Sequence, residues 1–140
     1  MQWGTHVNLQ NAGTDQAEWA YAIIESRDGG YISSGFGARS SGSVGPVLIK
    51  LDPNGEVVWQ KEYDPIGNGK YGVLSDLIED DQGNIAAVGY QQDIVSGKNH
   101  AILVYTDQFG VQLNPSTDVI PDFFSNQVEV GTNICLAPDG

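Results

Sequence analysis

Two stretches of this chain repeat each other and decide its fold: residues 19–37 have the sequence WAYAIIESRDGGYISSGFG, and residues 71–90 have the sequence YGVLSDLIEDDQGNIAAVGY. A second pair follows the first, since VLIKLDPNG at 47–55 recurs as ILVYTDQFG at 102–110. Both pairs are separated by about 55 residues, and a third copy begins near Gln127 and stops at residues 138–140. A period of this length predicts a repeat architecture, in which each unit needs a neighbour to bury its apolar face.

Each full unit contains four short stretches with the alternation or the apolar content of β-strands. Glycine-containing turns separate these stretches, for example Asp28-Gly29 in the first unit and Gln82-Gly83 in the second. The expected strands are 18–26, 30–36, 44–52 and 56–63, and then 72–80, 84–91, 100–107 and 111–114. No segment has a sustained apolar period of 3.6 residues, so we predict an all-β protein with little or no helix.

Four-stranded antiparallel units of about 40–55 residues are typical of the blades of a β-propeller. We therefore predict consecutive four-stranded antiparallel blades packed face to face, about two and a half units in a single propeller-like domain over residues 1–140. The expected parts are the end of a preceding blade at 1–6, a blade at 18–63, a degenerate blade at 71–114 and the start of a further blade at 127–140. A closed propeller needs at least four blades. We therefore expect the chain to continue into, or to pair with, further polypeptide.

The strand patterns also predict a core. Trp19, Tyr21 and Ile23 alternate and should share one face of their strand. The residues expected to be buried between the blades are Ile23, Ile49, Leu51, Ile78 and Val104.

The tryptophans have two candidate roles. Trp3 and Trp59 share a position in the repeat, so we expect them to seal blade against blade, with Trp59 mostly buried, rather than to stack on sugars. Trp19 and Tyr71 fall near each other in the register of the repeat. They are the candidates for an exposed rim that binds a ligand.

The motif Asp28-Gly-Gly-Tyr-Ile32, followed by Leu48-Ile-Lys-Leu-Asp52, Gly55 and Trp59, resembles a family of propeller-like repeats in secreted and cell-surface bacterial proteins, frequently from Bacteroidetes. The second unit is degenerate, since Asn114 stands where Trp59 would recur. The resemblance implies an extracellular location at the bacterial outer surface and a scaffold or binding surface for a protein or a glycan. It implies no shared chemistry, because function resides in sites that vary within a fold.

Composition argues against several classes of partner. The net charge is −12, and the six Lys and Arg residues are scattered, whereas a nucleic-acid surface needs clustered cations. Adhesion to an anionic membrane is disfavoured for the same reason, and no apolar run approaches the length of a membrane-spanning helix. Cys135 lies between Ile134 and Leu136 in a strand-like run, where a buried small hydrophobe is expected rather than a reactive thiol.

We find no convincing catalytic set and predict no catalytic residues, no metal ligands and no cofactor. The turns at 52–54 and 80–84 carry carboxylates, but they lack the correctly spaced glutamate of a calcium loop, and Ca²⁺ there is the weaker alternative. His6 and His100 lack ligand partners in metal-binding spacing. The leading hypothesis is a non-catalytic extracellular binding or scaffold module. The alternative is part of a carbohydrate-active propeller enzyme, a glycoside hydrolase or lyase, whose catalytic residues lie on other blades.

Overall fold

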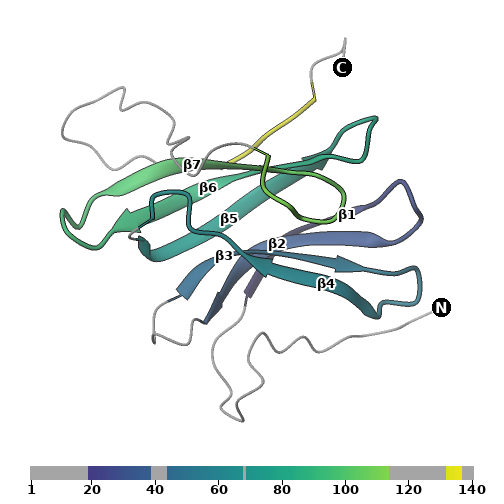
Figure 1. Ribbon diagram of the computed structural model, residues 1–140, viewed down its shortest axis with the longest axis horizontal. Helices are drawn as coiled ribbons and strands as arrows, with labels where there is room; N and C mark the ends of the chain where they lie inside the picture. The colour runs from purple at the N-terminus through teal and green to yellow at the C-terminus, as the bar shows by residue number, and fades with distance from the viewer. Residues whose placement is uncertain (1–18, 39–43, 68, 114–131, 137–140) are drawn as a thin grey trace.

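The computed structural model describes residues 19–38, 44–67, 69–113 and 132–136 (Figure 1). These residues form an all-β structure, as predicted, and no helix that could cross a membrane occurs among them. The seven strands are β1 (Trp19–Glu25), β2 (Tyr31–Ala38), β3 (Val44–Leu51), β4 (Val57–Glu62), β5 (Gly69–Glu79), β6 (Ile85–Asp93) and β7 (Asn99–Thr106). The predictions for Trp3, His6 and the end of a preceding blade lie outside the described residues.

The seven strands belong to one open sheet with the order β1-β2-β3-β5-β6-β7, and β4 pairs with β3. Every pairing is antiparallel except that of β3 with β5, which consists of the single parallel pair Val44 and Tyr71. The sheet therefore has two antiparallel parts, which we call the first unit (β1–β4) and the second unit (β5–β7).

The second unit lacks the predicted fourth strand at 111–114. Residues 111–113 lie beside β7 through one bridge between Thr106 and Gln112 and one hydrogen bond from the Leu113 amide to the Tyr105 carbonyl, at 2.7 Å. These contacts are too few for a strand, and Asn114 lies outside the described residues. The bounds of the other seven strands lie within three residues of those predicted.

The two units face each other and enclose the core (Figure 1). Ile32 and Leu48 come from the first unit. The larger contribution comes from the second unit, with Leu74, Leu77, Ile85, Ala87, Ile102 and Val104. The apolar side chains of both units are thereby removed from water, which is the main favourable term in folding.

The contact between the units is asymmetric. Ile23 pairs with Ser33 and Ser33 with Ile49, just as Leu77 pairs with Ala87 and Ala87 with Val104. We call the side of each unit that carries this row its front face. The row is buried in the second unit, where Leu77 is 2% exposed, but in the first unit it is open only at β1, since Ile23 is 58% exposed, Ile49 is half-buried and Ser33 is 7% exposed.

The opposite side of each unit is its back face. It carries the row Ile24, Ile32 and Lys50 in the first unit and the row Ile78, Ala86 and Tyr105 in the second. In the first unit Ile32 belongs to the core, and Ile24 packs against it. The core is therefore the back face of the first unit against the front face of the second.

This arrangement corrects part of the predicted core. Val104 is buried in the core between the units, as expected, whereas Leu51 is buried on the front face of the first unit and does not belong to that core. Ile49 and Ile78 are only half-buried. The prediction for Ile23 is wrong, because the first unit turns its back face, and not its front face, toward the core.

Each unit also carries a bulge with a glycine opposite it. The register shifts between Ala20 and Ala22 in β1 and between Leu74 and Asp76 in β5. A Cβ atom on Gly35 would lie 1.9 Å from the Trp19 carbonyl oxygen, and one on Gly89 would lie 1.8 Å from the Val73 carbonyl oxygen. The bulge brings the carbonyl over the neighbouring strand, so only glycine fits there.

Candidate functional site

A cleft of about 360 Å³ opens between the two units where β1 and β5 end. The turn after β1 contributes Arg27 and Asp28, and the end of β5 and its turn contribute Glu79 and Asp81. Lys50, Trp59 and Phe109 line the remaining sides. The cleft thus combines charged groups from both units with two aromatic side chains.

Lys50 is the centre of a polar network at the bottom of this cleft. It lies in β3 and is only 5% exposed. Its Nζ donates hydrogen bonds to the Ser26 hydroxyl and to Asp28 Oδ1, the latter at 2.8 Å. The Ser26 hydroxyl donates to Glu79 Oε1 and the Arg27 amide donates to Glu79 Oε2, both at 2.9 Å. Glu79 belongs to β5, so the network joins the two units.

The electrostatics of the network favour a charged pair. The hydrogen bond from Lys50 is the main reason that the pKa of Asp28 lies below its ordinary value; burial opposes this shift, and the Gly30 amide adds to it. A second ion pair joins Arg27 to Asp81 at 3.1 Å, but both side chains are exposed and water weakens their attraction.

The proximity of Ser26 to Lys50 raises the question of a nucleophile with its base. For Lys50 to act as that base, it would have to accept the proton of the Ser26 hydroxyl. Here Lys50 donates to Ser26, and Ser26 donates to Glu79. Ser26 is also 5% exposed, so this arrangement holds the two units together rather than presenting a nucleophile.

The second unit has a simpler version of the network. Tyr105 occupies the position of Lys50, and Asp80 occupies the position of Ser26. The Tyr105 hydroxyl donates to Asp80 Oδ2 over 3.4 Å. The pKa of Asp80 is lowered on balance, because hydrogen bonds from Asn84, Gln82 and Tyr105 outweigh the opposing effect of burial.

Sequence reasoning does not identify the Lys50 network, because Lys50 stands out there only as part of a repeat motif. The available signal was a lysine in the middle of the apolar run Val47–Leu51, where a charged side chain needs a buried partner.

Trp59 forms a wall of the cleft. It packs against the core, and its Nε1 donates to the Gln108 carbonyl of the second unit at 3.2 Å. A Cβ atom on Gly110 would lie 2.9 Å from the ring. Trp59 thus contacts the neighbouring unit as predicted, but it is half-buried rather than mostly buried because one side lines the cleft.

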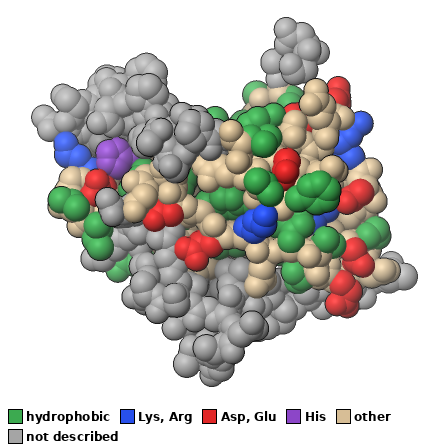
Figure 2. All heavy atoms as spheres, in the orientation of Figure 1, with side chains coloured by type: hydrophobic (Ala, Val, Ile, Leu, Met, Phe, Trp, Pro, Cys, Tyr) green, Lys and Arg blue, Asp and Glu red, His purple; other side chains and the backbone are tan. Residues whose placement is uncertain are grey.

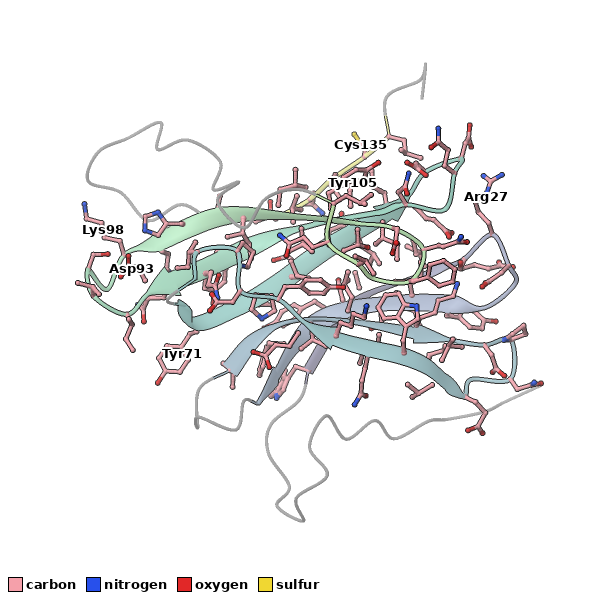
Figure 3. The ribbon with its side chains drawn as sticks, viewed as in Figure 1. Arg27, Tyr71, Asp93, Lys98, Tyr105 and Cys135 are labelled. Atoms are coloured by element: carbon pink, nitrogen blue, oxygen red, sulfur yellow. The ribbon has the colours of Figure 1, made fainter. Side chains whose placement is uncertain are left out.

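The proposed ligand rim lies at the other end of the strands. Trp19 is 62% exposed and stacks on Phe36, with the ring centroids 6.2 Å apart and 15° between the planes. Tyr21 lies on the same ring at 6.2 Å. Phe36 pairs with Pro46, and the Pro46 ring lies against Gly72, the neighbour of the exposed Tyr71. Figure 3 shows Tyr71 and Arg27 at opposite ends of the molecule.

The two turns considered for Ca²⁺ use their carboxylates internally. Asp52 Oδ1 accepts hydrogen bonds from the amides of Asn54 and Glu56, and Asp80 Oδ1 accepts from the amides of Gln82 and Asn84. Across the described ranges no three His, Cys, Asp or Glu residues gather closely enough to hold a metal ion.

The surroundings of Cys135 differ from those predicted. Residues 132–136 form no strand, and Cys135 is exposed. The segment is held at the second unit by a hydrogen bond from the Ile134 amide to Asp76 Oδ2, at 3.1 Å. Without strand pairing it does not bury its side chains, so the expectation of a buried thiol is wrong.

Comparison of the chain with models of known protein families and with curated proteins finds no match. The resemblance to the bacterial surface repeats therefore stays a prediction.

Proposed function

We propose that this chain is a non-catalytic binding or scaffold module of the bacterial cell surface or extracellular space, built of β-propeller repeats. One observation carries the proposal: the back face of the first unit packs on the front face of the second. Such a contact is head-to-tail and can be repeated by any number of similar units.

The segment 132–136 supports the same interpretation. Ile134 corresponds in the repeat to Ile23 and Leu77, the central residues of the front faces. Its amide binds Asp76, which lies on the back face of the second unit at the position of Ala22. Figure 1 shows this segment on the side of the second unit that faces away from the first. The start of a third unit would occupy this place.

A binding role is supported by the contrast between the two ends of the units. The buried polar groups of the cleft bind one another, whereas Trp19, Tyr21 and Tyr71 expose aromatic surface at the other end. Exposed aromatic rings of this kind suit a glycan or a protein partner. On the face drawn in Figure 2 acidic and basic side chains are interspersed, which agrees with the charge argument against nucleic acid.

The test is a glycan array and a pull-down of cell-surface proteins with the folded chain. We expect Trp19→Ala to abolish the binding that the wild type shows. Phe109→Ala is a matched control, because Phe109 is equally exposed at the opposite end, and it should bind normally. A folded wild type that binds no glycan and no protein would contradict the proposal. Hydrolysis or elimination products from the arrayed glycans would instead support the enzyme alternative.

A further inference from the structure

The front face of the first unit repeats the chemistry of an interface that the chain already contains. Glu25 pairs with Tyr31 and Tyr31 with Leu51, in the same register as Glu79, Ile85 and Thr106. Glu25 is therefore the counterpart of Glu79. Ile85 and Thr106 are fully buried, whereas in the first unit Glu25 is exposed, Tyr31 is half-buried and Leu51 is 6% exposed.

We infer that the exposed part of the front face of the first unit, which Ile23 and Glu25 form in β1, is a docking surface for the back face of another repeat unit. This inference rests on the proposed repeat architecture and adds the identity of the partner. The internal interface defines the geometry, because the same surfaces meet there once.

The chemistry of the internal interface specifies what the partner must offer. Glu79 accepts one hydrogen bond from the Ser26 hydroxyl and one from the Arg27 amide, both at 2.9 Å. The positively charged Nζ of Lys50 donates a hydrogen bond to the same Ser26 hydroxyl. Glu25 would be satisfied in the same way by a unit that has a hydroxyl residue at the position of Ser26 and a lysine at the position of Lys50.

A second copy of this chain does not offer that surface. The back face of its first unit already packs on its own second unit. The back face of its second unit presents the carboxylate of Asp80 at the position of Ser26, and the Ile134 amide already binds Asp76 there. A carboxylate facing Glu25 is repulsive, and such repulsion gives specificity against the wrong partner. The partner is therefore a unit of the first type, not of the second.

The test is a tandem protein in which a second copy of residues 17–70 is inserted directly before Ala17 of the full chain. This spacing reproduces that between β1 and β5. In the unmodified chain Ile23→Ala should hardly change the melting temperature, because Ile23 is 58% exposed. In the tandem protein the same substitution, made in the full chain and not in the inserted copy, should lower the melting temperature by about 5 °C or more. Val95→Ala, at an exposed turn, should have no effect in either protein.

A second variant tests the polar contact. Ser26→Asp in the inserted copy places a carboxylate against Glu25 and should lower the melting temperature, and Glu25→Gln should restore part of the loss. Equal effects of Ile23→Ala in the two proteins, or separate melting of the inserted unit, would overturn the inference. Concentration-dependent self-association of the unmodified chain that Ile23→Ala abolishes would overturn the choice of partner. None of these measurements needs an external ligand, so a failed binding screen leaves them unaffected.

Discussion

At the scale of single residues, Lys50 shows how a buried charge links two units. Lys50 is only 5% exposed in β3, and its ammonium group is compensated by Ser26 and Asp28. A buried ammonium group without partners would lose several kcal/mol of hydration free energy. A loss of this size is enough to favour the neutral amine over the charged form. A charged lysine at this buried position of β3 therefore requires the hydrogen bonds of the network.

Replacing Lys50 by methionine tests this interpretation. Lys50→Met keeps the packing of the side chain but removes the charged hydrogen bonds, so the free energy of unfolding should fall by about 1–3 kcal/mol. Urea denaturation measures the change. Lys98→Met is the control, because Lys98 is exposed in the turn after β6, and its effect should stay within about 0.5 kcal/mol. Equal effects of the two substitutions would contradict a role for Lys50 in stability.

The pKa of Asp28 gives a second prediction. The hydrogen bond from Lys50 is the first cause that lowers this pKa below 3.8 in the folded protein. Asp28 therefore contributes stability above its unfolded pKa, and this contribution is lost as the pH falls through the lower folded pKa. In Lys50→Met the pKa of Asp28 should rise, as measured by NMR titration of the carboxyl carbon. The pKa of Asp93, which the Ser96 and Val95 amides lower, should not move. An unchanged pKa of Asp28 would show that Lys50 is not its cause.

At the scale of strands and turns, the sequence allowed the all-β class and seven of the strands to be predicted, but not their union in one open sheet. Turn residues such as Asp28-Gly29 and Gln82-Gly83 have strong conformational preferences, and they fixed the strand bounds. Residues 111–114 were mispredicted because a strand also needs a neighbour to pair with. Whether a neighbouring strand is available depends on the arrangement of the whole sheet, and it cannot be read from the residues of the segment itself.

The turn after β7 shows a contact that sequence could not reveal. Gly110 has a φ of +73°, and a Cβ atom on it would lie 2.9 Å from the ring of Trp59. Gly29 has a φ of +82°, but a Cβ atom on Gly29 would lie 3.8 Å from its nearest neighbour, an ordinary contact distance. Both glycines are needed for backbone conformation, but only Gly110 is also needed for contact between the units.

This difference predicts a coupling between Gly110 and Trp59. Gly29→Ala should cost about 1–2 kcal/mol of unfolding free energy, because alanine disfavours positive φ. Gly110→Ala should cost more, since its Cβ would displace the Trp59 ring. In a Trp59→Ala background that excess should disappear, and a double-mutant cycle measures it. If Gly110→Ala still costs more unfolding free energy than Gly29→Ala when Trp59 is alanine, the extra cost does not come from contact with the Trp59 ring.

At the scale of the whole molecule, the orientation of the units could not be predicted from alternation. Alternating residues define two faces of a strand, and they do not say which face meets the neighbour. Ile23 and Leu77 have the same place in the repeat and are both apolar, but one is exposed and the other buried. The candidate cleft was missed for the same reason, because Ser26 and Glu79 meet only when the back face of one unit lies on the front face of the next.

The asymmetry of the two units gives the last prediction. Leu77→Ala removes a fully enclosed side chain and should lower the free energy of unfolding by about 2–5 kcal/mol. Ile23→Ala changes an exposed side chain and should stay within about 0.5 kcal/mol of the wild type. Urea unfolding of both variants measures the difference. Because the two positions are equivalent in sequence, only the head-to-tail packing of the units predicts unequal effects, and equal losses would mean that both front faces are covered in solution.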